Sequence, residues 1–370
     1  MFVRRLWLTD WRNHDALDLS FAPGLTAVVG ANGQGKTNLV EAIAYLATLD
    51  SFRGAPADAL VRVGADAAIV RAEVVHDDGR ELLVEAELPR VGRARVQVNR
   101  QRLARSRDLL GVLRATVFSP DDLELVKGGP AERRRYLDDT LVALHPRNDA
   151  LRNDLDRVLR QRSTLLKQAG GRLSSDVALT LDVWDAKLAQ LGEALAAARS
   201  ALVDVLSPRV TLAYERLASR PSAISLRYDA PWRAVGLAEA LAAGRAEDVR
   251  RQQCLVGPHR DELLLAVNAL PARTHGSQGE SRTLALALRL AAHETVTEQV
   301  GSPPVLLLDD VFSELDPQRS AALLAHLPAG QVILTTASGL PDGVAPERIL
   351  TMHAGPGSTA GWDDGAHGDR

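Results

Sequence analysis

The chain has 370 residues, 46% hydrophobic and 25% charged, a composition typical of a globular protein of about two domains. Its formal net charge of −3 excludes a uniformly basic surface, so any nucleic-acid-binding site must be a local patch. The single cysteine, Cys254, excludes an intrachain disulfide framework, and no apolar run suits a signal peptide or a membrane span. We therefore expect a cytoplasmic protein with no membrane partner.

The first elements surround a phosphate-binding motif. Alternating apolar residues predict two strands within residues 2–21, and a short apolar run at 25–29 predicts a buried strand. The apolar spacing of residues 38–46 predicts a helix. Between this strand and this helix, the motif G-x-x-x-x-G-K-[ST] is matched by Gly30, Ala31, Asn32, Gly33, Gln34, Gly35, Lys36 and Thr37.

This order of strand, loop and helix suits the binding of a nucleoside triphosphate. Glycines let backbone amides turn toward phosphate oxygens, and the helix N-terminus adds a partial positive charge. Lys36 would reach the β- and γ-phosphates, and the Thr37 hydroxyl would bind magnesium. The alternative, a tight glycine turn with a surface lysine, does not explain why every fixed position and both flanks match.

Short strands follow the first helix. Residues 68–88 alternate around a central turn, which predicts a hairpin, and residues 94–98 begin a second one. Arginines dominate residues 90–114, where Asp108 is the only acid. Two interpretations have equal weight: a charged, solvated sheet edge, or a surface that contacts the phosphate backbone of DNA. The candidate DNA-binding residues are Arg93, Arg95, Arg100 and Arg102.

Residues 131–206 are almost wholly helical in pattern. From Val177 to Val205 apolar residues repeat at alternating spacings of four and three, as in a coiled coil, and residues 151–165 carry a weaker matching pattern. We expect an antiparallel helical hairpin with its tip near Gly170-Gly171. The alternative is an ordinary helix packed on a globular core.

The alternation of strands and helices returns beyond residue 263. The strand expected at 305–308 ends in Asp309 and Asp310. A strand buried on both faces delivers such side chains at the carboxyl edge of a parallel sheet, where the phosphate loop also lies. Asp309 is then the magnesium-side acid, and Asp310 the group that orients or deprotonates the attacking water. A helix cap or turn is the weaker alternative beside an intact phosphate loop.

A second anion site is predicted at Ser277-Gln278-Gly279-Glu280, just before a strongly apolar helix at 281–292. A serine and a glycine at a helix start can bind an anion, although an isolated Ser-Gln-Gly is more often a plain N-cap. The loop at Lys36 already binds its own nucleotide. A second phosphate site therefore suggests that two chains share ATP at their interface, and Ser277, Gln278 and Gly279 are candidate nucleotide-binding residues.

Taken together, these motifs resemble the ABC-type ATPase heads of SMC-like proteins and, within that group, the RecF family of bacterial recombinational repair proteins. The resemblance spans residues 2 to about 340 in one order. Its supporting segments are residues 30–44, Ser51-Phe52-Arg53, residues 118–138, residues 256–261, Ser277-Gln278-Gly279-Glu280, residues 306–310 and Ser313-Glu314-Leu315-Asp316.

The resemblance implies an α/β fold, an ABC-type P-loop ATPase head with a mixed β-sheet and flanking helices. An inserted helical lobe with a short coiled-coil-like hairpin would split this head. The implied divisions are a head at residues 1–118 and 252–354, a lobe at 119–251 and a disordered tail at 355–370.

The same resemblance implies ATP and Mg²⁺ as cofactors of a slow ATPase that acts as a switch. Lys36, Asp309 and Asp310 would be its catalytic residues, and Thr37 with Asp309 would hold the metal. ATP would drive formation of a homodimer in which Ser277 and Gly279 of one copy cap the γ-phosphate at Lys36 of the other.

The implied partners are DNA and other repair proteins. The family binds single-stranded, gapped and double-stranded DNA, and with RecR and RecO it promotes loading of the recombinase RecA. It supports DNA replication, recombinational repair and the SOS response, so the protein would associate with the nucleoid when bound to DNA.

Three departures from the family pattern are visible. Asp310 stands where ABC heads usually carry Glu, a shorter reach consistent with slow turnover. The usual Gln is not evident near residues 119–121, so no metal contact is assigned there. Glu280 replaces a Gln of many relatives, from which we expect little effect.

Two alternative functions remain. A transporter ATPase subunit is disfavoured by the arginine-rich segment and the hairpin. An SMC-like structural organiser would carry arms of hundreds of residues, whereas this hairpin has room for about 30 Å per arm at 1.5 Å per residue.

Overall fold

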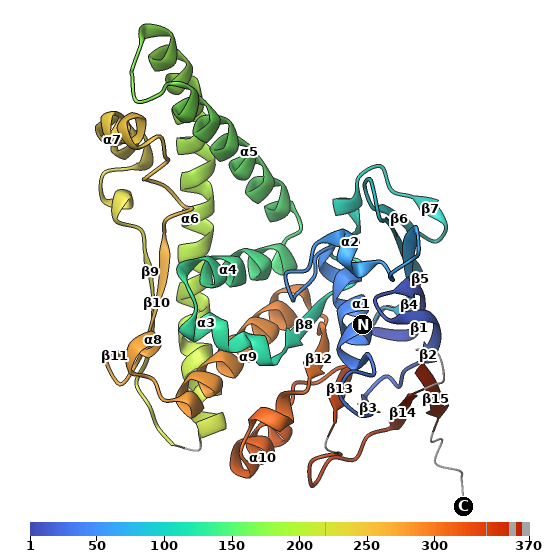
Figure 1. Ribbon diagram of the computed structural model, residues 1–370. Coiled ribbons are helices and arrows are strands. Elements are labelled where there is room, and N and C mark those ends of the chain that lie inside the picture. The colour runs from blue at the N-terminus through green and yellow to red at the C-terminus, as the bar shows by residue number, and fades with distance from the viewer. Residues whose placement is uncertain (219, 338, 355–359, 365–370) are drawn as a thin grey trace, which may run out of the picture. The chain divides into compact units, whose positions relative to one another are not determined.

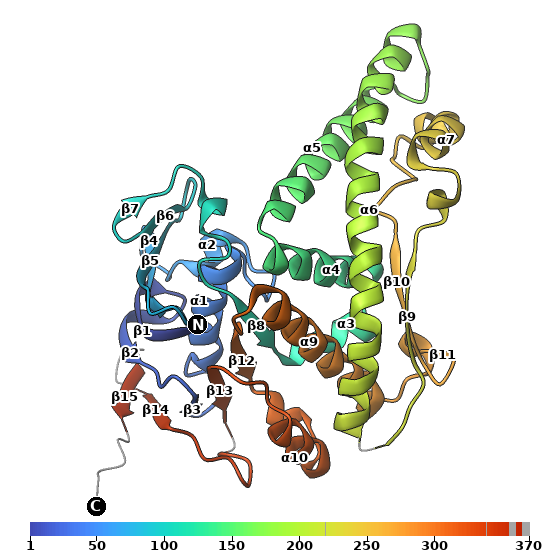
Figure 2. The same ribbon diagram turned by 180° about the vertical axis from the view of Figure 1, so that it is seen from behind.

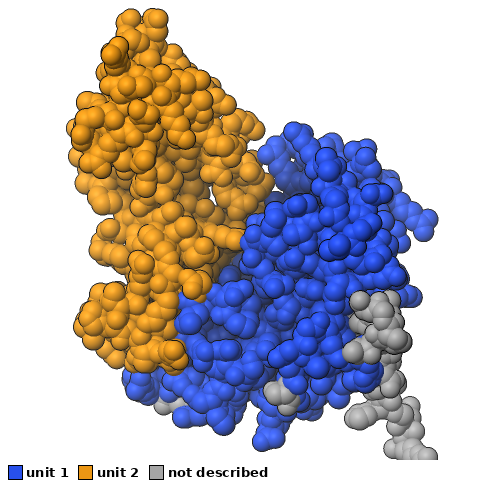
Figure 3. Space-filling view, viewed as in Figure 1, with its two compact units in different colours: residues 1–123, 213–221, 282–370 blue, residues 124–212, 222–281 orange. Residues whose placement is uncertain are grey.

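The computed structural model describes residues 1–218, 220–337, 339–354 and 360–364. The chain divides into two compact units, which Figure 3 draws in different colours. The first unit comprises residues 1–123, 213–221 and 282–370, and the second comprises residues 124–212 and 222–281. The second unit thus extends past residue 251, the end of the helical lobe that the family resemblance implies.

One sheet of the first unit is antiparallel, and its strands have the order β2-β1-β4-β5-β6-β7 (Figure 1). They are β1 (Phe2–Trp11), β2 (His14–Ser20), β4 (Ala67–Val75), β5 (Glu81–Pro89), β6 (Arg95–Val98) and β7 (Gln101–Arg102). Along β4 buried and half-buried residues alternate at every step, because successive side chains point to opposite faces. The strands predicted within 2–21 and both predicted hairpins are confirmed.

The other sheet of the first unit has the order β15-β14-β3-β13-β12-β8. Its strands are β3 (Leu25–Val29), β8 (Ala115–Phe118), β12 (Val305–Asp309), β13 (Val332–Thr336), β14 (Arg348–Ala354) and β15 (Ala360–Asp364). All pairs are parallel except β14 with β15. Every residue of β12 and β13 is buried, which explains the apolar run with which each strand begins.

The segment expected to be a disordered tail is only partly covered by the structure. Residues 360–364 form β15 and pair with β14. Residues 355–359 and 365–370 lie outside the described residues.

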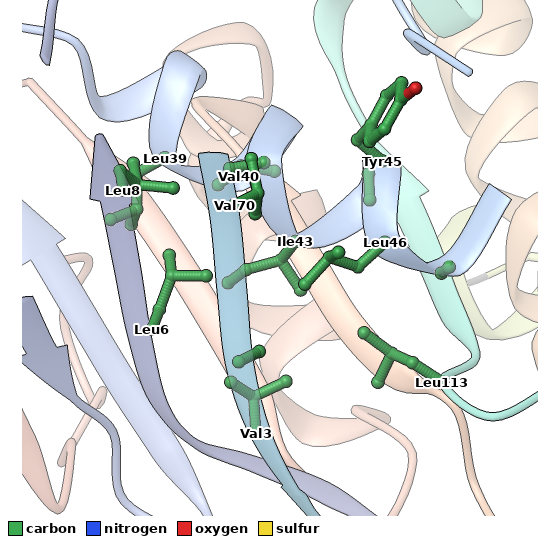
Figure 4. Packing of buried hydrophobic residues seen from close by; sticks show 14 of the residues in the cluster. Val3, Leu6, Leu8, Leu39, Val40, Ile43, Tyr45, Leu46, Val70 and Leu113 are labelled. Carbon is green, nitrogen blue, oxygen red and sulfur yellow. The ribbon is translucent and has the colours of Figure 1, made fainter. Parts of the chain in front are cut away.

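Helix α1 (Lys36–Thr48) forms the core of the first unit, because it contacts β1, β4 and β5 of the antiparallel sheet and β8, β12 and β13 of the parallel sheet. Figure 4 shows Leu39 and Ile43 of α1 packed with Leu6 and Val70 from the antiparallel sheet. The side chains that fill this space are fully buried, and the burial of each contributes about 1.5–3 kcal/mol to the stability of the fold. The core therefore fixes the start of α1, where the phosphate loop ends.

The remaining elements of the first unit lie around these sheets. They are α2 (Ala57–Leu60), most of α9 (Gln278–Val300), α10 (Pro317–Ala325), and the short 3₁₀ helices η1 (Ser106–Leu109), η2 (Pro120–Asp122) and η4 (Val311–Glu314).

The second unit is mainly helical and also contains a small sheet of order β11-β10-β9. Its helices are α3 (Leu123–Lys127), α4 (Pro130–Leu144), α5 (Arg147–Gln168), most of α6 (Ser175–Ala218), η3 (Pro231–Ala234), α7 (Leu237–Arg251) and α8 (Ala272–His275). Its strands are β9 (Ile224–Asp229), β10 (Glu262–Val267) and β11 (Leu270–Pro271).

Helices α5 and α6 form the predicted hairpin, with its tip at residues 169–174. Figures 1 and 2 show that the two helices meet near this tip and diverge toward α4. Near the tip Leu166 and Leu181 share one buried cluster. The fully buried Arg162 of α5 pairs with Asp185 of α6 and Asp248 of α7, each at 2.6 Å. The hairpin is thus locked into its own unit rather than built as a free coiled coil.

None of the helices in the described residues is both long and apolar enough to cross a membrane.

Candidate functional site

The phosphate loop joins the end of β3 to the start of α1. Gly33 and Gly35 have φ angles of 82° and 101°, in the left-handed region that favours glycine. A Cβ on Gly35 would lie 2.6 Å from Asn13 Oδ1, and a Cβ on Gly30 would lie 2.5 Å from Gln34 Oε1. Backbone conformation or lack of space therefore excludes a side chain at these positions.

Lys36 is the first residue of α1 and is only 6% exposed. Its Nζ donates hydrogen bonds to the carbonyls of Gly30 (2.7 Å) and Ala31 (2.9 Å). Burial lowers the pKa of Lys36, and the carboxylates of Asp310 and Asp309 oppose that shift. A buried ammonium beside a helix N-terminus is suited to an anion that carries several charges.

Thr37, Asp309 and Thr335 meet at the carboxyl edge of the parallel sheet. Asp309 Oδ1 accepts hydrogen bonds from Thr37 Oγ1 (3.0 Å) and Thr335 Oγ1 (2.8 Å). Parallel pairing of β12 with β13 places Asp309 opposite Thr335. Burial raises the pKa of Asp309, and the hydrogen bonds from both threonines oppose the shift. The structure brings Thr37 and Asp309 together as the sequence predicts, and their role as metal ligands stays a prediction.

Asp310 turns away from the strand with a left-handed backbone, φ 49°, which Asp tolerates better than most residues. Its backbone N–H donates to the carbonyl (3.2 Å) and to the hydroxyl (3.0 Å) of Thr335. Asp310 Oδ1 and Gln34 Oε1 are buried and have no hydrogen-bond partner among the described residues. Such an oxygen costs about 1–3 kcal/mol if nothing donates to it, so both atoms are suited to contact a ligand or water.

Sequence reasoning missed the residues that support the loop from the turn between β1 and β2. Asn13 Nδ2 donates to the Gln34 carbonyl (3.3 Å), and His14 Nε2 lies 3.2 Å from the Gly35 carbonyl. Arg12 pairs with the fully buried Glu41 of α1 at 2.7 Å, which fixes this turn against the helix. No local pattern marks these residues, because their contacts depend on strand β1 lying beside α1.

These residues fit a nucleotide with magnesium. The loop supplies turned backbone and a lysine for phosphate, and Thr37 with Asp309 supplies two oxygen ligands for a cation. No group of three or more His, Cys, Asp or Glu side chains in the described residues is arranged to hold a metal by itself. Magnesium commonly binds through one or two protein oxygens together with phosphates and water, so the small ligand set is suitable.

The segment Ser277-Gln278-Gly279 lies in the second unit, at the start of α9. Ser277 forms a capping box with Glu280: the Ser277 N–H (3.0 Å) and Oγ (2.9 Å) donate to Glu280 Oε2, and the Glu280 N–H donates to Ser277 Oγ (3.2 Å). The N-cap interpretation weighed for this motif therefore describes its local structure. Contact with a nucleotide stays a prediction.

The candidate DNA-binding arginines lie at and beside β6 and β7, and all four are exposed. Arg95 pairs with Glu87 of β5 at 3.1 Å. Arg102 lies opposite Gln97 and so shares the sheet face of Arg95, while Arg100 has a left-handed φ of 65° in the turn. Arg93 forms no ion pair with any described residue. The structure thus has features of both interpretations, a charge-paired sheet face and an unpaired cation at its edge.

Comparison with known proteins places these features in a family. The RecF/RecN/SMC N-terminal domain family matches residues 2–338. The DNA replication and repair protein RecF of Streptomyces avermitilis is 46% identical over 353 residues, which cover 91% of this chain and 94% of that protein. The protein of the same name from Frankia alni is 48% identical over 357 residues, with coverage of 91% and 93%. The chain belongs to the RecF family.

Solved structures agree with this assignment to RecF. The recombination mediator protein RecF–ATP in the RecFOR pathway superposes with a TM-score of 0.89 at 28% identity, over 99% of this chain and 98% of that one. An Smc head domain from Pyrococcus furiosus, bound to the C-terminal domain of ScpA, has a TM-score of 0.59 at 16% identity, over 98% and 96%, and shows the fold alone. The predicted fold class, an α/β ABC-type head with an inserted helical lobe, is confirmed.

Proposed function

We propose that this RecF-family chain is an ATP-dependent DNA-binding protein of replication and recombinational repair. In this proposal ATP makes two copies associate, and the DNA-bound dimer acts with RecO and RecR to promote RecA loading and SOS induction. The names of its relatives, a DNA replication and repair protein and a recombination mediator, support this function.

The observation that carries the proposal is the convergence of Lys36, Thr37 and Asp309 at one edge of the parallel sheet. Lys36 would bind the β- and γ-phosphates, while Thr37 and Asp309 would hold Mg²⁺. When bound, the metal supplies positive charge to the phosphates that the protein alone does not provide. The hydroxyl of Thr335 keeps Asp309 oriented toward Thr37.

Asp310 would orient the attacking water through its carboxylate. Its Oδ1 has no donor among the described residues and is free to accept a hydrogen bond. The short side chain and the constrained left-handed backbone limit its reach, which favours slow hydrolysis. Slow hydrolysis suits a switch whose ATP-bound form must persist while partners assemble.

Ser277, Gln278 and Gly279 would complete the site of a second copy. Ser277 is exposed, and the first turn of α9 supplies backbone N–H groups that suit a phosphate. We propose that these residues cap the γ-phosphate held at Lys36 of the partner, so that ATP and not ADP drives association.

DNA would contact the edge of the antiparallel sheet through Arg93, Arg95, Arg100 and Arg102. Exposed arginines in this number can replace counterions on the phosphate backbone without reading the sequence. The proposed substrates are single-stranded, gapped and linear double-stranded DNA.

No observation favours the transporter or SMC-organiser alternatives. The 22-residue α5 is about 33 Å long at 1.5 Å per residue, too short for an arm that encircles DNA.

The proposal is tested by measuring affinity for gapped, single-stranded and blunt double-stranded DNA with ATP, with ADP and without nucleotide. We expect ATP to strengthen binding to at least one of these substrates. Equal affinity in all three nucleotide conditions, with ATP shown to bind, would contradict it.

A further inference from the structure

Lys127, the last residue of α3, contacts the backbone immediately before Ser277. Its Nζ donates to the carbonyl of Gly276 at 2.5 Å and lies 3.4 Å from the carbonyl of Arg273. Among the described residues these two carbonyls are its only partners, and no carboxylate pairs with it. The half-buried ammonium therefore acts on one backbone segment rather than in a surface ion pair.

The end of α3 is held rigidly, which fixes the position from which Lys127 reaches out. Arg133 is 4% exposed and donates to the carbonyls of Leu125 (3.2 Å) and Gly128 (3.0 Å). The same guanidinium pairs with Glu262 of β10 at 2.8 Å and 3.0 Å. A buried cation thus binds one carbonyl of α3 and one just beyond its end, and it ties both to the small sheet of the second unit.

Lys127 and Glu280 bind the two ends of one peptide group. The carbonyl of Gly276 and the N–H of Ser277 belong to the same planar unit. Lys127 donates to that carbonyl oxygen, and the N–H donates to Glu280 Oε2 at 3.0 Å. A cation and an anion on opposite sides of the peptide set the direction in which the chain enters Ser277.

The neighbouring contacts leave this peptide little freedom. A Cβ on Gly276 would lie 2.6 Å from the Ala272 carbonyl oxygen and 3.0 Å from Ser281 Oγ, so only glycine fits. The Ser277 carbonyl accepts bonds from the Ser281 N–H (2.9 Å) and Oγ (2.8 Å). The Ser277 carbonyl is thus already occupied by two donors. Lys127 instead donates to the carbonyl of Gly276.

We propose that Lys127 is a positioning residue, which holds the Gly276–Ser277 peptide so that Ser277 and the N-terminal turn of α9 face the nucleotide of a second copy. This inference rests on the proposed role of Ser277 in the ATP-bound dimer. Lys127 itself touches neither nucleotide nor metal. Its effect appears in ATP-driven association and not in the binding of ATP to the phosphate loop of a single chain.

The test compares Lys127→Met with Lys127→Arg. A charge-assisted hydrogen bond is lost in the first variant, so we expect the dimer dissociation constant with ATP to rise roughly tenfold or more. The affinity of the monomer for ATP, measured at protein concentrations below dimerisation, should change by less than about twofold. Lys127→Arg retains a donor and a charge, and we expect it to restore most of the association.

Lys167→Met is the matched control, because Lys167 is an exposed lysine of α5 in the same unit. We expect it to dimerise like the original chain. If Lys127→Met does not fold, Lys127→Gln keeps a neutral donor in place, and an intermediate loss of association is expected. Wild-type association of a folded Lys127→Met or Lys127→Gln variant would overturn the inference.

Ser277→Ala separates this inference from the proposed function. If Ser277→Ala associates with ATP as the original chain does, the shared site itself is wrong. If Ser277→Ala weakens association and Lys127→Met does not, only the role of Lys127 is wrong. In the double variant the losses should be less than additive, because Lys127 acts through Ser277. Fully additive losses would also overturn the inference.

Discussion

The first unit contains a buried lysine in the phosphate loop and a group of exposed arginines at the sheet edge, and it holds them in very different ways. Lys36 is 6% exposed and donates hydrogen bonds to two loop carbonyls. The carboxylates of Asp310 and Asp309 favour its charged form, against the lowering of its pKa by burial. The arginines at β6 and β7 are exposed, and one of them already pairs with Glu87. The first arrangement prepares a site for one anion of defined shape. The second makes a diffuse charged surface, where each residue contributes little and salt weakens every contact.

We expect the largest effect from Lys36→Met. This change removes the buried cation that is expected to bind the β- and γ-phosphates. We expect affinity for ATP to fall at least about 100-fold, roughly 2.8 kcal/mol, with loss of every ATP-dependent property. Fluorescent-nucleotide titration measures it, and Lys187→Met, which alters a lysine of α6, is the control. ATP-dependent DNA binding that survives in Lys36→Met would contradict the role of the loop.

A variant of Asp310 tests whether the site at the phosphate loop also hydrolyses ATP. Asp310→Asn keeps the size and tolerates the left-handed backbone, but it removes the carboxylate charge. We expect the rate of hydrolysis to fall about 100-fold or more while ATP-driven association persists, since general-base assistance commonly contributes 10²–10⁴-fold. Steady-state phosphate release and sizing measure the two properties. An unchanged hydrolysis rate would remove Asp310 from the reaction.

Burial also makes the interior of the first unit sensitive to acid. His293 is 1% exposed, and burial lowers its pKa from 6.5 to about 4. Between these values the unfolded chain binds a proton that the folded chain does not. Stability from this residue is therefore complete above pH 6.5 and is lost as pH falls toward 4.

The variant His293→Gln should flatten this dependence by up to about 1.4 kcal/mol per pH unit. Its amide can still reach Thr116, which lies 3.1 Å from His293 Nδ1. Urea unfolding at pH 7.5, 6 and 5 measures the slope. If the slope is the same in the variant, His293 takes up its proton in the folded state as well.

The smallest effects are expected at the arginine edge. Arg93→Gln should reduce the slope of log affinity against log salt by about one, the effect of one lost phosphate contact. Glu87→Gln should strengthen DNA binding a few-fold, because it frees Arg95 from its partner. Electrophoretic or anisotropy titration at several salt concentrations measures both. Unchanged slope and affinity in the two variants would remove this edge from the DNA surface.

The same contrast explains how much could be predicted from sequence. The phosphate loop and the acid strand were predictable, because strand, loop and helix are local patterns and parallel pairing brings Thr37 to Asp309. Asn13, His14 and Thr335 were not, since only the packing of distant strands brings them to the loop. At the sheet edge the arginines could be counted from sequence. Their pairing depends on register, as Arg95 opposite Glu87 shows.

Two features of the second unit had no usable sequence signal. Strands β9 and β10 pair across more than thirty intervening residues that include α7, so neither alternation nor spacing connects them. The ion cluster around Arg162 joins α5, α6 and α7 through charged residues that look like ordinary surface positions in the sequence. Such buried pairs are specified by the whole fold and not by a local motif.

The central claim is that one nucleotide is held by Lys36 of one copy and by Ser277 of another. The most direct measurement is the molar mass in solution by light scattering, with Mg²⁺ and saturating ATP, with ADP, and for Ser277→Ala with ATP. For a chain of 39.8 kDa we predict a dimer with ATP, a monomer with ADP, and a substantially weakened dimer for the variant. A monomer in all three conditions at micromolar concentrations, or a full dimer in the variant, would contradict the account.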